Sequence, residues 1–244
     1  MKFRPHALIE WDETSVRCER VKYKAPCEEC TGDCPGYRLL WNRWVIGIER
    51  GDRSTMIVDQ LPWKTSAAGG SGVPICDEEC DNFCVPHMQK YLVNLSDGAA
   101  PYEAFAGGKI RCSPDCTRKD CLKRAEAAGL EKCPGLRPRE GRARFKSLYK
   151  HLQMSHGIVT HSKEEWSQVK EVRVWGPNGS RTIQLKHGTQ VADGIWAELK
   201  DSIPSIHSSD HERIADYVHA WIWTARRHGK DIFLELGKAV ASLR

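Results

Sequence analysis

The chain of 244 residues is long enough to bury one substantial core, and its composition, with 28% charged and 40% hydrophobic residues, is that of a globular protein. Its net charge of +5 and its pI near 8.6 are compatible with a phosphate-rich partner without requiring one. The sequence shows neither an apolar run of roughly 18 residues nor the apolar core of a signal peptide. We therefore expect no membrane span and an intracellular location, nuclear in a eukaryotic host.

Apolar segments bounded by turn residues predict seven strands. The five strands expected in a main sheet are residues 7–16, 41–49, 54–59, 91–95 and 156–161. The first three are expected to form an antiparallel meander with a turn at Gly51. Residues 169–175 and 182–185 are expected to form an additional hairpin.

Two helices with an apolar face are expected at residues 191–202 and 210–228, followed by a helical tail over residues 229–244. Residues 1–228 are interpreted as one domain with cysteine-rich insertions. These insertions are expected at residues 17–40, 73–88 and 108–136. The order of strands and helices is typical of the α/β RNase H-like fold, a mixed five-stranded sheet with flanking helices.

Three acidic residues stand at the ends of these expected elements. Asp12 closes the first strand, Asp97 follows the fourth, and Asp193 opens the first helix. A carboxylate is costly to bury unless a cation or hydrogen bonds compensate it, so we expect the three to cluster around metal. Glu13 is expected to face solvent, because adjacent strand residues point to opposite faces.

The chemistry that such a cluster can perform is phosphodiester cleavage with two metal ions. Carboxylates from separate elements hold the two cations roughly 3.5–4 Å apart, where one activates water or a 3′-hydroxyl and the other stabilises the leaving oxygen. Mg²⁺ suits this task because it takes oxygen ligands and keeps positions open for phosphate and water.

Six segments, in this order, resemble the motifs of one family. They are Glu10-Trp-Asp-Glu-Thr14, Trp44-Val-Ile-Gly-Ile-Glu-Arg-Gly51, Asp97 with Tyr102, His156-Gly-Ile-Val-Thr-His-Ser162, Thr189-Gln-Val-Ala-Asp-Gly-Ile-Trp196 and Tyr217-Val-His-Ala-Trp-Ile-Trp223. Through them the chain resembles the transposase domain of the Merlin superfamily and its related bacterial insertion sequences, a branch of the DDE transposases. The matches span most of residues 5–225 apart from the cysteine insertions.

The resemblance implies a DNA transposase that cuts transposon ends and joins them to target DNA, with DNA as partner and a homo-oligomer assembled on it. It implies Asp12, Asp97 and Asp193 as ligands of two Mg²⁺ or Mn²⁺ ions. It also implies His161 as an active-site neighbour that contacts phosphate or orients an acid. The sequence departs from the family at the third acid, which is usually Glu or Asn. The family usually carries an N-terminal zinc-ribbon or helix-turn-helix segment, so a fragment is one interpretation of the sequence.

His156 and His161 lie on one expected strand and face opposite sides of it. At most one of them is therefore expected to reach the acids. The other is interpreted as a structural histidine.

The cysteine spacing is near that of structural zinc sites, which need four nitrogen or sulfur ligands. Three candidate sets are Cys18, Cys27, Cys30 and Cys34; Cys76, Cys80, Cys84 and His87; and Cys112, Cys116, Cys121 and Cys133. The sets could also share ligands. Alternatively, the cysteines of the second set, at helical spacing on one face, behave as small apolar core residues.

A basic run is the best candidate for DNA contact, although a solvated loop is the alternative. It contains Arg137, Arg139, Arg142, Arg144 and Lys146. Two further functions stay open at this point. One is a catalytically inactive, zinc-stabilised DNA-binding protein derived from a transposase, and the other is a metal-dependent nuclease that cuts without strand transfer.

Overall fold

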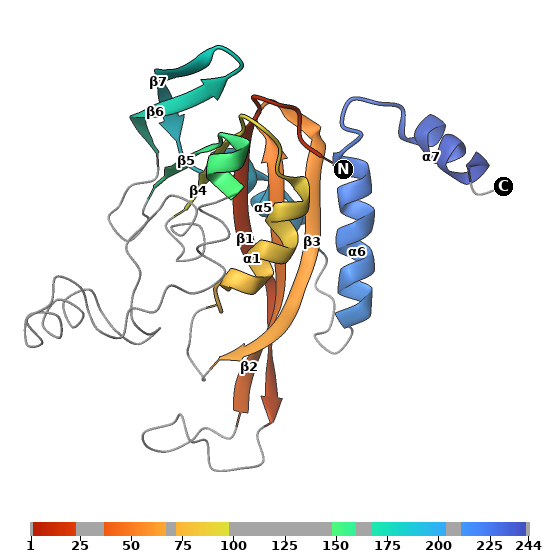
Figure 1. Ribbon diagram of the computed structural model, residues 1–244. Coiled ribbons are helices and arrows are strands. Elements are labelled where there is room, and N and C mark those ends of the chain that lie inside the picture. The colour runs from red at the N-terminus through yellow and green to blue at the C-terminus, as the bar shows by residue number, and fades with distance from the viewer. Residues whose placement is uncertain are drawn as a thin grey trace, which may run out of the picture.

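A mixed five-stranded sheet forms the centre of the protein (Figure 1). The computed structural model describes residues 2–22, 37–66, 72–97, 148–159, 167–203 and 211–242. The strands of the sheet are β1 (Leu8–Lys22), β2 (Tyr37–Glu49), β3 (Asp52–Ser66), β4 (Val93–Ser96) and β5 (Ser155–Ile158). Their order is β3-β2-β1-β4-β5, in which the first three are antiparallel and β4 and β5 run parallel to β1. The predicted α/β class and the antiparallel meander are confirmed.

The strands β1 and β2 extend further than the sequence predicted. Their pairing continues to Lys22 opposite Tyr37, after a register shift between Ser15 and Arg17. Residues 17–22 and 37–40 are therefore strand rather than part of a cysteine-rich insertion, which corrects that boundary. Backbone pairing holds this end of the hairpin together, so its side chains do not need the apolar pattern of a buried strand.

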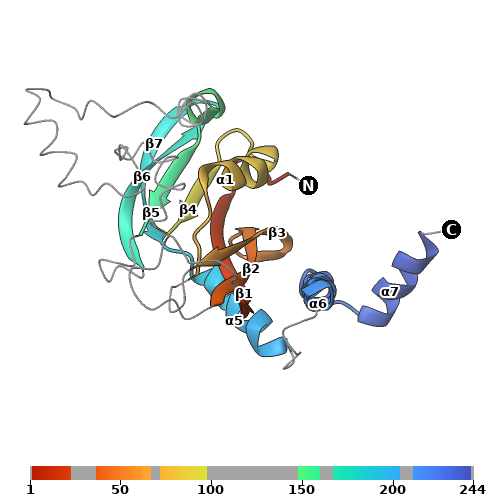
Figure 2. The same cartoon turned by 90° about the horizontal axis from the view of Figure 1, so that it is seen from below.

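The two faces of the sheet have separate cores, and helices cover both (Figure 2). On one face, Trp44, Ile46 and Ile48 of β2 pack against α5 (Gln190–Ser202) and α6 (His211–Ala225). The opposite face is covered by α1 (Asp77–Cys84), which is followed by the 3-10 turn η1 (Val85–His87). There, the ring of Trp11 leaves no room beside Gly47, where a Cβ atom would lie 2.5 Å from it.

Two elements stand apart from this body. The hairpin of β6 (Gln168–Gly176) and β7 (Gly179–His187) lies beside the β4–β5 edge and packs through Val172 on Val93 and Leu95. The helix α7 (Ile232–Ala241) lies at the C-terminal end, away from the sheet (Figures 1 and 2). No helix within the described ranges is long and apolar enough to cross a membrane.

Candidate active site

Asp12, Asp97 and Asp193 line one cavity of about 380 Å³. The remaining lining residues are Glu13, Thr14, Trp196, Ala197 and Lys200. The three aspartates come from β1, from the residue that follows β4, and from the first turn of α5. The structure thus brings together the three acids that the sequence singled out, from elements far apart in the chain.

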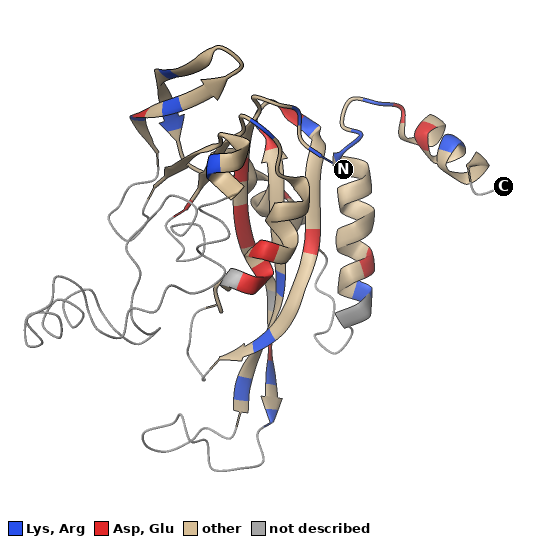
Figure 3. Cartoon of the chain, in the orientation of Figure 1, with Lys and Arg blue, Asp and Glu red and all other residues tan. Residues whose placement is uncertain are grey.

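The sheet register explains why the first two acids meet. The parallel strands β1 and β4 pair Trp11 with Ser96, so the next residues, Asp12 within β1 and Asp97 just after β4, lie at the same level of the sheet. Acidic positions of β1 are red in Figure 3, in the body of the sheet. Asp12 lies on the same strand face as Glu10, because residues two apart share a face. That face is the one covered by α5.

The carboxylate of Glu10 fixes the start of α5. It is fully buried, and its Oε2 accepts hydrogen bonds from the backbone N–H groups of Val191 at 2.8 Å and Ala192 at 3.0 Å. An acid at a helix N-terminus satisfies otherwise unpaired N–H groups and complements the helix dipole. Asp193 is the next residue, so Glu10 sets its position. An acid within an apolar strand is the one sign of this contact in the sequence.

Arg50 completes the attachment of α5. Its guanidinium forms an ion pair with Glu10 and donates to the carbonyl oxygens of Lys186 at 2.6 Å and Gly188 at 2.9 Å. The first of these carbonyls lies near the end of β7, and the second lies in the segment that joins β7 to α5. The pair of Glu10 and Arg50, which we call the α5 clamp, therefore holds both the helix and the chain that leads into it.

The electrostatics of the cavity are dominated by negative charge around Asp12, which is only 7% exposed. Burial raises the pKa of Asp12 well above its usual range. The negative charges of Glu13, Asp193 and Asp97 raise that pKa further. A cation in the cavity would oppose both effects, because it stabilises the ionised carboxylates.

The donor set fits a hard divalent cation. Three carboxylates from separate elements offer oxygen ligands of the kind that Mg²⁺ and Mn²⁺ take. Within the described ranges, no group of three or more His, Cys, Asp or Glu side chains is close enough to hold an ion as placed. The acids therefore share a cavity, with Asp12 buried and its pKa raised by the others, and would need to draw together to coordinate one ion.

The other charged residues of the cavity refine the sequence prediction. Asp193 is exposed, and its Oδ2 accepts a hydrogen bond from the hydroxyl of Thr189 at 3.1 Å. Glu13 lines the cavity, but its Oε1 lies 3.5 Å from the backbone nitrogen of Ile75 on the α1 face, so the expected opposite-face placement holds although the side chain is half-buried rather than solvent-facing. Lys200, two turns after Asp193 on the same helix, adds a positive charge that the sequence analysis did not single out.

His156 is the structural histidine of the expected pair. It is half-buried on β5, where Nε2 lies 2.8 Å from the hydroxyl of Ser96 and Nδ1 lies 3.1 Å from that of Tyr149. Burial, and secondarily the nearby His187, lower the pKa of His156 to about 3. The ring is therefore neutral and engaged on both nitrogens. His161 lies outside the described residues.

The second cysteine set is mainly a core feature. Cys80 and Cys84, on one face of α1, are completely buried among apolar side chains, with their sulfur atoms 3.7 Å apart. Cys76 precedes the helix, and His87 packs against the ring of Phe83. The described part of the chain shows no zinc-binding group here. This arrangement matches the apolar alternative, although the sulfur separation is also one that two thiolates on a shared zinc would have.

The remaining candidates cannot be placed. Cys18 is exposed on β1, and the rest of its set lies outside the described residues. The same holds for the third cysteine set and for the basic run of residues 137–146. Their zinc-binding and DNA-binding roles stay predictions.

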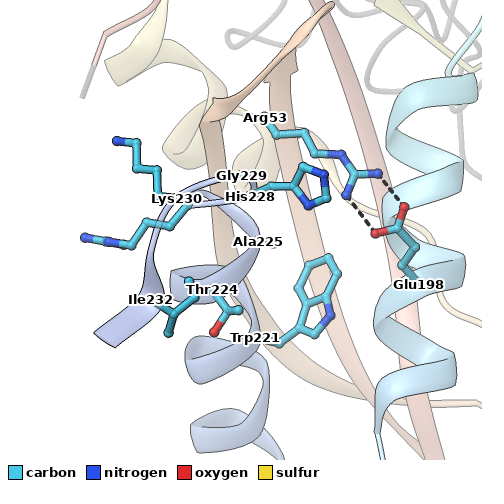
Figure 4. Close-up of a pocket in the computed structure, with 10 residues that line it drawn as sticks. Arg53, Glu198, Trp221, Thr224, Ala225, His228, Gly229, Lys230 and Ile232 are labelled. Carbon is cyan, nitrogen blue, oxygen red and sulfur yellow. Dashed lines mark hydrogen bonds and ion pairs between the residues drawn. The ribbon is translucent and has the colours of Figure 1, made fainter. Parts of the chain in front are cut away.

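A second cavity, of about 290 Å³, lies between α5, α6 and β3 (Figure 4). Arg53 reaches across it to Glu198 of α5, and Trp221 lies below this ion pair. His228 and Lys230 add positive charge at its edge. The basic residues follow the C-terminal end of α6, where cations offset the helix dipole, so a structural role accounts for them.

The chain matches no known family model, and neither characterised proteins nor solved structures yield a match. The function is therefore argued from the site and from the sequence motifs around it.

Proposed function

We propose that the protein is a metal-dependent phosphodiester-cleaving enzyme with an RNase H-like fold, acting on DNA as a DDE-type transposase. The observation that carries the proposal is the cavity lined by Asp12, Asp97 and Asp193. The strand order β3-β2-β1-β4-β5, with β4 and β5 parallel to β1, supports the fold assignment. The sequence motifs around the acids support the choice of transposase over other enzymes of this kind.

The residues of the cavity have separate tasks in this proposal. Asp12 and Asp97 would hold the ions from the sheet, and Asp193 would close the site from α5. Two bound Mg²⁺ or Mn²⁺ ions would activate the attacking oxygen and stabilise the leaving oxygen. Lys200 would contact a phosphate of the DNA, because its ammonium group carries the positive charge that the acidic cavity otherwise lacks.

A metal-dependent nuclease is the second candidate, because the same cavity would serve hydrolysis without strand transfer. We keep this candidate because the third acid departs from the transposase pattern. Asp193 is one methylene shorter than the Glu that often stands there. Products joined to a target strand would separate the two enzymes.

The test is calorimetric binding of Mn²⁺ to the whole protein and to two variants. Asp97→Asn removes a charge from the cavity, whereas Asp201→Asn removes one from an exposed position on α5 that does not line it. We expect Asp97→Asn to weaken Mn²⁺ binding at least tenfold and Asp201→Asn to leave it unchanged. Equal binding by the two variants would overturn the metal site.

The second arm measures cleavage. We expect the protein to nick plasmid DNA in Mn²⁺, and Asp12→Asn to abolish nicking while Asp201→Asn retains it. Mn²⁺ binding without cleavage of any DNA would instead favour the inactive, DNA-binding alternative.

A further inference from the structure

A third cavity, of about 470 Å³, has a different chemistry from the acidic site. It lies between the tip of the β6–β7 hairpin and the beginnings of β1 and β4. Its floor is formed by Leu8, Val93, Val174 and Ile183. Leu8 precedes Asp12 by four residues, so this aromatic cavity, as we call it, lies about 13 Å along β1 from the acid.

Two stacked rings form one wall of the aromatic cavity. The rings of His6 and Tyr91 are 4.8 Å apart between centroids, and their planes differ by 15°. Trp175 of β6 also lines the cavity and is half-buried. Small-molecule sites are largely apolar and aromatic, with a few polar groups that fix orientation, and this lining has that composition.

The backbone beneath the stacked rings is strained at both residues. His6 has a φ of 66° and Tyr91 a φ of 67°, in the left-handed region that bulky side chains rarely adopt. Glycine would relieve this strain at either position. The two rings are therefore held in place against a local cost, and such outliers gather at ligand sites.

The charge of the residues that line the aromatic cavity indicates which kind of ligand it would bind. Arg181 is exposed and lacks an ion pair or hydrogen bond with any described residue, and the lining contains no Asp or Glu. Lys and Arg positions, blue in Figure 3, continue over the hairpin. A ligand that complements this cavity carries a flat aromatic ring and an adjacent negative charge.

We infer that the aromatic cavity binds an unpaired nucleotide, with the base stacked on Tyr91 and His6 and the phosphate paired with Arg181. Stacking on aromatic side chains and charge pairing with arginine are the two contacts by which proteins hold single-stranded nucleic acid. The site extends beyond the proposed function, because it needs neither the acids nor metal.

The experiment uses deoxyadenosine monophosphate as the probe, with the whole protein in metal-free buffer. The indole N–H resonance of Trp175, assigned by its loss in Trp175→Phe, reports binding, and that of the exposed Trp63 serves as control. We expect a saturable shift of the Trp175 resonance and none at Trp63. Absence of a shift at millimolar nucleotide would overturn the inference.

Two variants separate a nucleotide site from a structural stack. Tyr91→Gly removes the ring and relieves the strain, so the protein should remain folded while affinity falls at least fivefold. Arg181→Gln should weaken binding of the nucleotide but not of adenosine. Binding that survives Tyr91→Gly, or an equal shift with inorganic phosphate alone, would show that no base is recognised.

The outcomes are independent of the proposed chemistry. Nucleotide binding should be unchanged in Asp12→Asn, which disables the acidic site. If nucleotide binds while cleavage fails, the aromatic cavity stands and the enzyme proposal falls. If cleavage occurs without nucleotide binding, only the aromatic cavity is overturned.

Discussion

The burial and the charge environment of single residues in this protein depend on which neighbours the sheet places beside them. The sequence identified Asp12, Asp97 and Asp193 because each stands at the end of an apolar element. It missed Glu10, since its partners are backbone N–H groups of a helix some 180 residues later in the chain. Alternation along the strand places Glu13 on the face opposite to Asp12, but it could not predict that the segment before α1 partly covers this side chain.

The buried Asp12 should make metal-free protein less stable as the pH rises. Its raised pKa means that the folded state binds a proton more tightly than the unfolded state. The resulting loss of folding stability is absent below the pKa of Asp12 in the unfolded state, near 3.8, and complete above its pKa in the folded state. Asp12→Asn should therefore raise the melting temperature by a few degrees at pH 7, and by nothing near pH 3.5.

Thermal unfolding in chelator, at several pH values, measures this difference. With Mn²⁺ at pH 7, the unsubstituted protein should instead melt at a higher temperature than Asp12→Asn, because only the unsubstituted protein has all three carboxylates to bind the ion. A variant no more stable than the native protein at pH 7 would show that the burial of Asp12 is already compensated.

His156 should give the opposite dependence of folding stability on pH, with a loss of stability as the pH falls. Its folded pKa of about 3 lies below its ordinary value, so the unfolded state takes up a proton that the folded state refuses. Stability should fall as the pH drops from about 6.5 toward 3, by up to about 1.4 kcal/mol per pH unit from this residue.

Urea unfolding at pH 7 and pH 5 tests this. His156→Gln keeps polar atoms near Ser96 and Tyr149 but cannot titrate, so the loss of stability between the two pH values should shrink. His151→Gln, at an exposed position nearby, is the matched control and should leave the loss unchanged. Equal losses in all three proteins would contradict a neutral His156.

At the level of elements, apolar periodicity was sufficient to predict the five strands and the helices α5 and α6. It could not predict how far β1 and β2 extend, because their outer ends are held by backbone pairing rather than by burial. The helix α1 was considered only as an alternative for the second cysteine set. Its buried Cys80 and Cys84 act as small apolar residues, a role that cysteine spacing alone does not distinguish from metal binding.

The α5 clamp should matter more for stability than a comparable ion pair at the surface. Glu10→Gln removes the charge that Arg50 and the start of α5 require, and should cost about 2–4 kcal/mol because the pair is largely buried. Glu198→Gln, which breaks the exposed pair with Arg53, should cost less than about 1 kcal/mol.

Denaturant unfolding measures the free energies of unfolding of both variants, and Mn²⁺ binding tests the same variants in a second way. Glu10→Gln should also weaken Mn²⁺ binding, because Asp193 loses its fixed position, whereas Glu198→Gln should not. Equal free energies of unfolding for the two variants would mean that the clamp contributes no more than a surface contact.

The whole molecule is a sheet with one core on each face and a helix outside both. Packing of this kind cannot be read from the sequence, since α7 is more apolar than α5 and α6 yet exposes Phe233, Leu234, Leu236 and Val240. The periodicity of α6 predicted its burial correctly, because Ile214, Val218 and Ile222 meet β2 and α5.

Two phenylalanines should therefore behave differently. Phe83 packs edge-on against Trp11 in the core beneath α1, so Phe83→Ala should cost about 3–5 kcal/mol. Phe233 is 87% exposed on α7, so Phe233→Ala should change the free energy of unfolding by less than about 0.5 kcal/mol. A large cost at Phe233 in dilute protein would place α7 within the cooperative unit.

The α5 clamp also separates the hairpin of β6 and β7 from the helix of the third acid. Arg50 binds the backbone at Lys186, near the end of β7, and at Gly188, before the helix of the third acid begins. Changes in hairpin length are thus absorbed upstream of these contacts and need not move Asp193. The turn at Pro177 and Asn178 is accordingly a place where the protein can accept foreign sequence, such as a tag or a second binding module, while its acidic site keeps its geometry.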